Sequence, residues 1–208
     1  MSTLSTSEPG ALDRAVEVLR RGGLVAYPSD TVYGLAALPA NDRAVEQLFR
    51  VKQRPAEQSM PLLISSPHDL AKVAANVPPV ALRLIGHFWP GALTIVLARA
   101  PSFHSNAVAG DTVALRVPDH AVPRELVQRL ASAITGTSAN VSGGPEPVTA
   151  DDVRAQIGDG VDLILDGGPC AGGTPSTVID CVEEPPRIVR EGAISREELV
   201  RAAGTQIQ

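Results

Sequence analysis

Apolar residues recur at helical spacing in four stretches of the chain. In the first, Leu12, Val16 and Leu19 would share one buried face of a helix. The same spacing predicts helices over 12–19, 44–52, 80–88 and 124–130. Three further segments have the composition of helix N-termini and each predicts a short helix: Ser66-Pro67, Thr149-Ala150-Asp151-Asp152, and Ser195 with Glu198.

Short apolar runs bounded by polar, glycine or proline residues predict strands. They lie at 24–27, 61–64, 92–97, 112–117, 131–137, 161–165, 177–180 and 187–190. Because several of these strands follow one another without a helix between them, we expect an α/β fold with a mixed sheet. A chain of 208 residues has the size of one domain. We therefore interpret residues 10–208 as a single domain and the small, polar residues 1–9 as a flexible tail.

The composition is that of a globular protein, with 44% apolar and 20% charged residues. The longest apolar run, 92–98, is far shorter than the roughly 20 residues that cross a bilayer. Residues 1–10 lack the basic and apolar segments of a secretory signal. Cys170 and Cys181 are too few for a disulfide framework, so we expect reduced thiols. These features predict a cytoplasmic protein without a membrane span.

Charge and motifs exclude several common classes of protein. The 23 acidic and 18 basic residues give a net charge of −5, whereas a protein that holds duplex nucleic acid through phosphates is usually basic. The sequences GxxxxGK[ST], GxGxxG and HExxH are all absent. The segment 136–140 begins like a nucleophile elbow but ends in Asn140 instead of glycine, so a hydrolase serine is not expected. The four histidines have no metal-ligand spacing, and no resident metal site is predicted.

Four cations lie at the ends of predicted elements or within an apolar stretch. Lys52 and Arg54 follow a predicted helix, where the macrodipole alone would favour them by ~0.3–1 kcal/mol. Arg116 interrupts an apolar stretch, so it needs an anion, which is either a ligand or a structural ion-pair partner. Arg190 ends a predicted strand, and a partner within the following turn is the alternative to a ligand.

Short polar side chains accompany these cations. Ser138 and Asn140 leave a predicted strand and enter a glycine-rich loop, and Ser176 follows a second such loop. These side chains either bind a ligand or satisfy a turn. The set suits binding of a polyanion, with catalysis by positioning and electrostatic stabilisation, since no covalent nucleophile stands out. The residues therefore predict phosphoryl or nucleotidyl transfer.

Seven short segments, in this order, resemble the YrdC-like threonylcarbamoyl-adenylate synthases over about residues 24–194. They are Tyr27-Pro28-Ser29-Asp30-Thr31-Val32-Tyr33-Gly34-Leu35, Lys52-Gln53-Arg54-Pro55, Trp89-Pro90-Gly91, Arg116-Val117-Pro118-Asp119-His120, Thr137-Ser138-Ala139-Asn140-Val141-Ser142-Gly143, Ser176-Thr177-Val178-Ile179-Asp180 and Arg190-Glu191-Gly192-Ala193-Ile194. The resemblance implies a twisted open sheet with helices packed around it and a concave cationic cavity. It also implies the short form of the family, without the extra C-terminal domain.

The resemblance implies an activity and its ligands. L-threonine, bicarbonate or carbon dioxide, and ATP with bound Mg²⁺ would give threonylcarbamoyl-AMP and pyrophosphate. The threonylcarbamoyl group would then pass, through downstream tRNA-modification proteins, to the adenosine beside the tRNA anticodon. Direct binding of tRNA is expected to be weak or absent.

The resemblance also assigns roles to residues of this chain. It implies catalytic roles for Lys52, Arg54, Ser138 and Asn140. It implies contacts to ATP from Lys52, Arg54, Thr112, Asn140 and Arg190, and contacts to threonine from Thr31, Arg116, Ser138 and Ser176, with Arg116 facing the carboxylate. Departures from the usual family pattern include Ser29-Asp30 in place of Thr-Glu, and Leu63 in place of a histidine near threonine.

Two other functions remain open. One is an RNA-binding module, which usually needs aromatic side chains for base stacking, and the chain has only three Phe, two Tyr and one Trp. The other is a sensor that binds ATP or threonine without turnover. Release of pyrophosphate distinguishes the synthase from both alternatives.

Overall fold

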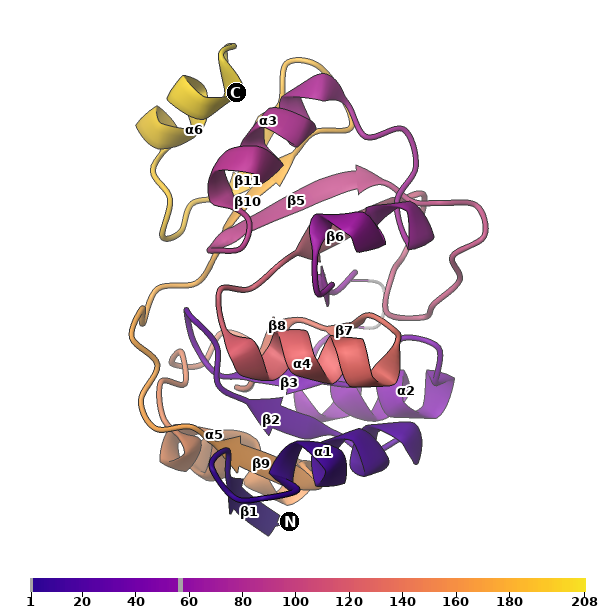
Figure 1. Cartoon of the computed structure of the whole chain (residues 1–208), viewed down its shortest axis with the longest axis vertical. Coiled ribbons are helices and arrows are strands. Elements are labelled where there is room, and N and C mark those ends of the chain that lie inside the picture. Colours follow the sequence, from indigo (N-terminus) through magenta and orange to yellow (C-terminus); the bar gives the residue numbers. More distant parts are fainter. Residues whose placement is uncertain (1, 56–57) are drawn as a thin grey trace.

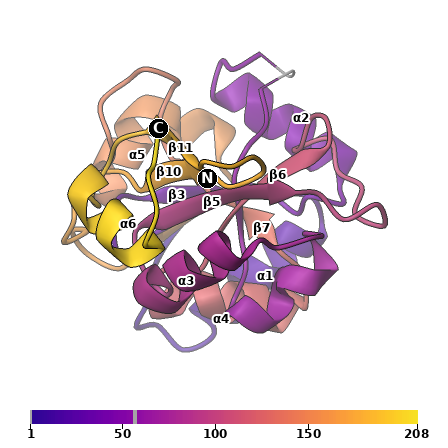
Figure 2. The ribbon, with the colours of Figure 1, turned by 90° about the horizontal axis from the view of Figure 1, so that it is seen from above.

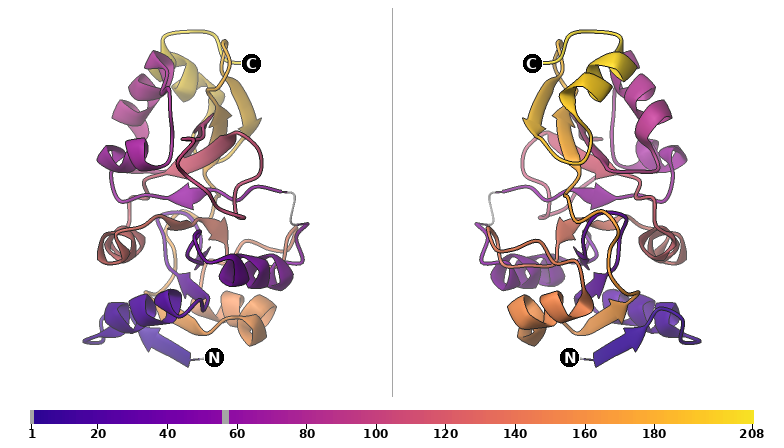
Figure 3. Two further views of the ribbon diagram at one scale, coloured as in Figure 1. Left: turned by 90° about the vertical axis from the view of Figure 1, so that its right-hand side faces the viewer. Right: turned by 90° about the vertical axis from the view of Figure 1, so that its left-hand side faces the viewer.

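The chain forms two mixed β-sheets that follow one another along its long axis (Figure 1). The computed structural model describes residues 2–55 and 58–208. The N-terminal end lies at the five-stranded sheet and the C-terminal end at the six-stranded sheet, as both side views show (Figure 3). Helices cover the outer sides of the sheets.

The five-stranded sheet contains the N-terminal strands. Its order is β1 (Ser2–Ser5), β9 (Leu163–Asp166), β2 (Val25–Tyr27), β3 (Gly34–Ala36) and β8 (Thr137–Ser138). Strand β9 pairs in parallel with both β1 and β2, whereas β3 is antiparallel to β2 and β8. The helices beside this sheet are α1 (Ala11–Arg20), α2 (Asp42–Val51) and α5 (Ala150–Ile157), and α5 runs on into the 3₁₀ turn η2 (Gly158–Gly160).

The six-stranded sheet contains most of the C-terminal strands. Its order is β11 (Arg187–Arg190), β10 (Thr177–Asp180), β5 (Leu93–Ala98), β6 (Thr112–Arg116), β4 (Leu62–Leu63) and β7 (Ile134–Thr135). The remaining helices are η1 (Pro67–Lys72), α3 (Pro79–Phe88), α4 (Ala121–Leu130) and α6 (Arg196–Ala203). Helix α6 packs beside α3 on the outside of this sheet (Figure 2). Helix α4 packs against α1 and so spans the two halves.

One apolar cluster joins the two sheets. It includes Ala26 and Leu35 from the five-stranded sheet and Ile95 and Leu115 from the six-stranded sheet, all with 0% exposure. Because a shared core makes the two halves depend on one another, the sheets form one domain. The mixed α/β class is therefore confirmed, but the single sheet that we expected is wrong.

The two sheets are connected where the predicted strand 131–137 divides. Its first part, β7, pairs with β4, and its second part, β8, pairs with β3 of the other sheet. Gly136 stands between them, and a Cβ there would lie 2.7 Å from a methyl carbon of Leu63. A glycine is therefore needed where the chain passes from one sheet to the other.

Three other segments differ from the sequence-based expectation. The flexible tail expected at 1–9 is wrong for residues 2–5, because they form β1, whose backbone pairs with β9. Strand β3 is not predicted, since its three residues are too few to show a pattern. Helix α4 begins at Ala121, three residues before the predicted start, and Pro123 fits its first turn because a proline lacks only an N–H that is unpaired there.

The structure also describes the state of the two cysteines and the apolar character of the helices. Cys170 and Cys181 are both free thiols, the first half-buried and the second buried. Within the described residues, none of the helices has the length and apolar character that a membrane crossing requires.

Candidate functional site

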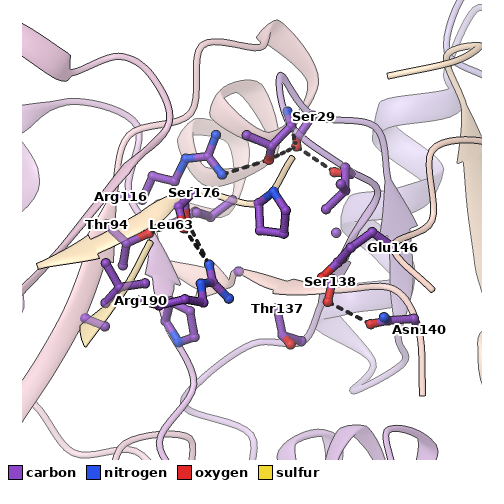
Figure 4. Close-up of a pocket in the computed structure, with 18 of the residues that line it drawn as sticks. Ser29, Leu63, Thr94, Arg116, Thr137, Ser138, Asn140, Glu146, Ser176 and Arg190 are labelled. Atoms are coloured by element: carbon purple, nitrogen blue, oxygen red, sulfur yellow. Dashed lines mark hydrogen bonds between the residues drawn. The ribbon is translucent and has the colours of Figure 1, made fainter. Parts of the chain in front are cut away.

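A cavity of about 520 Å³ lies between the two sheets, and all nine candidate residues from the sequence line it. They are Thr31, Lys52, Arg54, Thr112, Arg116, Ser138, Asn140, Ser176 and Arg190. Its volume is within the range of about 300–1,000 Å³ that is usual for small-molecule sites. In the close-up, Thr94, Arg116, Ser176 and Arg190 project from one side and Ser138, Asn140 and Glu146 from the other (Figure 4).

The alternation of the strands explains one wall of the cavity. In β6, Thr112, Ala114 and Arg116 are two residues apart and therefore share one face, which lines the cavity. Val113 and Leu115 point to the other face and are buried in the core. Ala114 pairs with Val96 of the neighbouring strand, which also lines the cavity.

The ammonium group of Lys52 lies in the other wall of the cavity. Lys52 follows the last turn of α2 and is 2% exposed. Its Nζ donates to the backbone oxygen of Ser138 at 2.6 Å, and to the backbone oxygen and Oδ1 of Asn140 at 2.9 and 3.2 Å. An ammonium has three hydrogens, so these three acceptors use all of them. Lys52 therefore holds the segment 138–140 in place, and its charge lies within the wall of the cavity.

Ser138 and Asn140 complete this hydrogen-bonded unit. The Ser138 hydroxyl donates to Oδ1 of Asn140 at 2.7 Å. Nδ2 of Asn140 donates to the carbonyl oxygens of Gly144 and Pro145 at 3.0 and 3.2 Å. The side chains thus satisfy the loop that they enter, as the structural alternative expected. The loop residues Gly143, Gly144 and Glu146 also line the cavity, so the same hydrogen bonds shape its surface.

Arg54 has one donor without a hydrogen-bond partner among the described residues. Its Nη2 donates to the backbone oxygen of Ser59 at 2.9 Å. Its Nε is buried and has no hydrogen-bond partner in the described part of the chain. A buried donor without a partner is rare in folded proteins and here faces a ligand-sized cavity. Burial, and next the charge of Arg190, lowers the pKa of Arg54.

Arg190 reaches the cavity from β11 at the edge of the six-stranded sheet. Its Nη2 donates to the backbone oxygen of Ser176 at 2.7 Å and lies 3.3 Å from the Ser176 hydroxyl. Ser176 also shares a hydrogen bond of 2.8 Å with Thr94. Burial is the largest influence on Arg190 and lowers its pKa, Glu146 raises it and Arg116 lowers it. The partner of Arg190 is thus Ser176, in the loop before β10, and not a residue of the turn that follows Arg190.

Arg116 has the ion-pair partner that its buried position requires. Its Nη2 lies 2.7 Å from both carboxylate oxygens of Asp30. Nη1 donates to the hydroxyl of Thr31 at 3.0 Å, and Nε donates to the backbone oxygen of Gly91 at 2.8 Å. Thr31 is also bonded to Ser29, whose hydroxyl lies 3.1 Å away. The structural ion pair is therefore present, and Arg116 lines the cavity as well.

The charges of the lining are predominantly positive. Among the described residues, Lys52, Arg54, Arg116 and Arg190 line the cavity with one acidic residue, Glu146. Because Asp30 compensates Arg116, the charge that is open to a ligand is mainly that of Arg54 and Arg190, while Lys52 adds its charge from within the wall. Like charges held close together in a poorly solvated cavity favour an anionic ligand.

Sequence reasoning assigned no role to several polar residues that line this cavity, among them Thr94, Glu146 and Ser29. Thr94 is a 2% exposed threonine in an apolar strand, and its position on the same face as Val96 is a signal that alternation could have provided. Glu146 lies in a loop with no regular pattern, so no sequence signal identifies it. Ser29 is buried and bonds within its own turn, and the sequence marks it only as a departure from the usual family pattern.

Histidines and metal-ligand clusters do not contribute to the cavity. His120 caps the N-terminus of α4, where its Nδ1 accepts from the backbone N–H of Val122 at 3.2 Å. Burial lowers the pKa of His120, which keeps the ring neutral. Across residues 2–55 and 58–208, no three His, Cys, Asp or Glu side chains are close enough together to hold a metal ion.

Several curated proteins are similar to the chain over most of its length. It is 36% identical over 203 residues to the threonylcarbamoyl-AMP synthase of Bacillus subtilis, covering 97% of this chain and 58% of that protein. It is 38% identical over 191 residues to a putative threonylcarbamoyl-AMP synthase of Mycobacterium tuberculosis, covering 91% of this chain and 88% of that protein. The chain thus spans less than two thirds of the first relative and most of the second.

Solved structures share the fold. Sua5 of P. abyssi in complex with L-threonine superposes with a TM-score of 0.91 at 34% identity, covering 100% of this chain and 62% of that one. YciO of E. coli superposes with a TM-score of 0.83 at 26% identity, covering 95% and 96%. A profile of the Sua5/YciO/YrdC family, described as "Telomere recombination", matches residues 17–192. The chain therefore belongs to the Sua5/YciO/YrdC family.

Proposed function

We propose that the cavity between the sheets synthesises threonylcarbamoyl-AMP and pyrophosphate from L-threonine, bicarbonate or carbon dioxide, and ATP. The observation that carries this proposal is the convergence of Lys52, Arg54 and Arg190 on a cavity that also contains the paired Arg116. The names of the relatives and the threonine complex of P. abyssi Sua5 support the same reaction.

The distribution of charge suggests where each substrate binds. The triphosphate belongs beside Arg54 and Arg190, because these guanidinium groups have lowered pKa values and an unsatisfied Nε, which anionic oxygens would relieve. The amino acid belongs at the other end, where Arg116 and Ser176 offer donors of modest net charge and Thr31 helps to hold the Arg116 guanidinium. The apolar surface near Arg190, to which Val178 contributes, suits the adenine ring.

The reaction joins two anions, and this requirement assigns the main task of the cations. The threonine amine attacks the carbon of carbon dioxide or bicarbonate and loses a proton, giving a carbamate, with water as the second product when bicarbonate is used. A carbamate oxygen then attacks the α-phosphorus of ATP, and the bond to the β-phosphate oxygen breaks to release pyrophosphate. Positive charge held in place lowers the repulsion and stabilises the charge that develops on the leaving group.

Mg²⁺ is part of the proposal as a companion of ATP. Glu146 is the acidic residue of the described lining, and one carboxylate does not make a resident metal site. Such a site suits an ion that is held mainly by phosphate oxygens, with Glu146 available as a single protein ligand. The ion would supply further positive charge at the phosphates.

The product determines which partner the enzyme needs. Threonylcarbamoyl-AMP is a mixed anhydride that water hydrolyses, so a further protein must receive it quickly. We propose transfer to the adenosine beside the tRNA anticodon by cytoplasmic tRNA-modification proteins. The acidic net charge and the small number of aromatic residues, three Phe, two Tyr and one Trp, favour an enzyme that does not itself hold tRNA.

The test is a pyrophosphate assay with each substrate omitted in turn, coupled to mass spectrometry of the nucleotide product. The synthase predicts pyrophosphate and threonylcarbamoyl-AMP only when ATP, threonine and bicarbonate are all present. A sensor would bind ATP or threonine without releasing pyrophosphate. Pyrophosphate release that does not depend on threonine would contradict the proposal.

A further inference from the structure

Asp30 lies behind Arg116 and does not line the cavity. Its side chain is 16% exposed, and that of Arg116 is 9% exposed. Asp30 influences three other titratable groups, because its charge acts to raise the pKa values of Tyr27, His120 and Cys170. Tyr27 and Cys170 are uncharged at neutral pH and His120 is kept neutral by burial. Arg116 is therefore the cation to which Asp30 is matched in its described surroundings.

Three protein groups fix the guanidinium of Arg116 before any ligand binds. Asp30 holds Nη2, the Thr31 hydroxyl accepts from Nη1, and the backbone oxygen of Gly91 accepts from Nε. Each nitrogen therefore has a protein partner, and the plane of the group is set. Thr31 and Gly91 contribute neutral acceptors. Asp30 alone supplies both a charge and two acceptor atoms.

The hydroxyl network next to Arg116 depends on this orientation. The Ser29 hydroxyl donates to the backbone oxygen of Val32 at 2.6 Å, so its single hydrogen is used there. The contact of 3.1 Å between the Ser29 and Thr31 hydroxyls must then have Thr31 as the donor. Thr31 consequently accepts from Arg116 and donates to Ser29. One arrangement of hydrogens satisfies Asp30, Arg116, Thr31 and Ser29 together.

We propose that Asp30 is a positioning residue for amino-acid recognition, acting through Arg116. It holds the guanidinium so that the second hydrogen of Nη1, which Thr31 does not use, faces the site of the substrate carboxylate. It also cancels the charge of Arg116, so this end of the cavity recognises a carboxylate by geometry and does not compete for the triphosphate. The inference rests on the proposed function, because it assigns the carboxylate of threonine to this end.

The consequence is a selective loss of affinity for threonine when Asp30 is neutralised. In Asp30→Asn the amide no longer offers two equivalent acceptors, so Arg116 can turn away from Thr31. We expect the KM for threonine to rise by about tenfold or more, the loss typical of one charged hydrogen bond. The KM for ATP should stay within about twofold, because Asp30 does not line the cavity. Asp30→Glu should recover much of the loss, since the carboxylate is retained.

A double substitution tests whether Asp30 acts through Arg116. If it does, Asp30→Asn combined with Arg116→Gln should raise the KM for threonine no further than Arg116→Gln alone. Additive effects would overturn the inference. Asp13→Asn is the matched control, because Asp13 pairs with Arg129 on the surface of α1 and α4 and should change neither KM. Circular dichroism establishes that each variant is folded, and Asp30→Ser, which also removes the carboxylate, replaces Asp30→Asn if the latter is not.

Calorimetric titration with threonine alone separates this inference from the proposed function. The inference predicts binding to the wild type that is about tenfold or more weaker in Asp30→Asn. If the wild type releases threonine-dependent pyrophosphate but Asp30→Asn leaves both the KM and the binding of threonine unchanged, only the inference fails. If the wild type neither binds threonine nor releases pyrophosphate, the proposed function fails and the inference fails with it.

Discussion

At the scale of single residues, Lys52 is the most constrained cation of the site. Its three hydrogens all reach backbone or amide oxygens of the segment 138–140. Burial, and to a lesser extent the charge of Arg54, lowers its pKa to about 8, while Glu146 raises it. Loss of the proton would leave three acceptors facing an amine with two hydrogens. The loop that lines the cavity and the charge of the cavity thus depend on the same proton.

This dependence predicts a fall in activity above about pH 8 as Lys52 deprotonates. Glu146→Gln removes the charge that raises the pKa of Lys52. The activity of this variant should therefore begin to fall at a lower pH than the activity of the wild type. Pyrophosphate release is measured in both proteins at a fixed concentration of carbon dioxide, from about pH 6.5 to about pH 10, a range that spans the lowered pKa of Lys52. If the activity of both proteins falls at the same pH, a group other than Lys52 controls the pH dependence.

A rise in pH should have the opposite effect on stability: deprotonation of Lys52 lowers activity, whereas its contribution to the free energy of unfolding increases. Its folded pKa of about 8 is below its usual 10.5, so the unfolded chain binds the proton more tightly between these values. The contribution of Lys52 to the free energy of unfolding therefore rises with pH across this window, by up to roughly 3 kcal/mol. Urea unfolding of the wild type and of Lys52→Met between pH 7 and 10.5 measures it. The same slope in both proteins would contradict the assignment.

Arg54 is expected to contribute mainly to turnover. Its buried Nε has no partner in the part of the chain that the structure describes, so it is a donor that a ligand would satisfy. Arg54→Ala should lower kcat by about 100-fold or more, as for removal of a preorganised donor at a developing charge. Arg50→Ala is the control, because Arg50 is an exposed arginine in the last turn of α2, the helix that precedes Arg54. Near-normal pyrophosphate release by Arg54→Ala would remove Arg54 from the catalytic set.

Residue types and spacing identified the lining of the cavity better than they identified hydrogen-bond partners. Local pattern made Arg116 and Arg190 candidates for a site but left a structural partner open for each, and their roles came from the resemblance to the family. Their partners are 86 and 14 residues away, at Asp30 and Ser176, and only the folded chain brings them together. The roles given to the nine residues remain predictions until they are tested.

At the scale of elements, local patterns identified helices and longer strands because they depend on neighbouring residues. The capping boxes at Thr149 and Ser195 are present, and strands β10 and β11 have their predicted bounds. Strand β1 could not be found in this way. Three of its four residues are small and polar, and it exists because β9, about 160 positions further along the chain, pairs with it. Long-range pairing of this kind leaves no local sequence signal.

The turn that joins β11 to α6 is held close to the loop before β10. A Cβ on Gly192 would lie 2.4 Å from the backbone oxygen of Pro175 and 2.6 Å from the carbonyl carbon of Ser176. Gly192→Ala should therefore displace Ser176 and its contact with Arg190, and destabilise the protein by about 2 kcal/mol. Urea unfolding and the KM for both substrates measure the two effects.

Gly86 in α3 provides the matched control for this substitution. No atom lies within 4 Å of a Cβ added there. Gly86→Ala should stabilise the protein by up to about 1 kcal/mol, because alanine favours the helical backbone, and should leave activity unchanged. Equal effects of the two substitutions on stability would contradict the role given to the close approach at Gly192.

At the scale of the whole molecule, the cavity lies between two sheets that share one core. Cations gathered there repel one another in the free protein, so a ligand that neutralises them should stabilise both halves. The apolar cluster contains buried side chains from each sheet, and α4 packs against α1 between them. We therefore expect the two sheets to unfold together.

The chain has one tryptophan, Trp89, which reports on the half that contains α3 and β5. Its fluorescence and the far-ultraviolet circular dichroism should give the same unfolding midpoint, because the whole domain is one cooperative unit. ATP and threonine at 100 times their dissociation constants should add at least about 2.7 kcal/mol and raise both midpoints together by roughly 5–10 °C. Separate midpoints, or a shift in only one signal, would contradict the shared core.

The measurement that tests the central claim most directly is a crystal structure with L-threonine and an ATP analogue whose α–β phosphate bridge cannot be cleaved. The account predicts the triphosphate against Arg54 and Arg190 and the threonine carboxylate against Arg116 and Thr31, within one cavity. A triphosphate in the separate groove along α2 that Glu46 and Phe49 line, or a threonine carboxylate out of reach of Arg116, would contradict it.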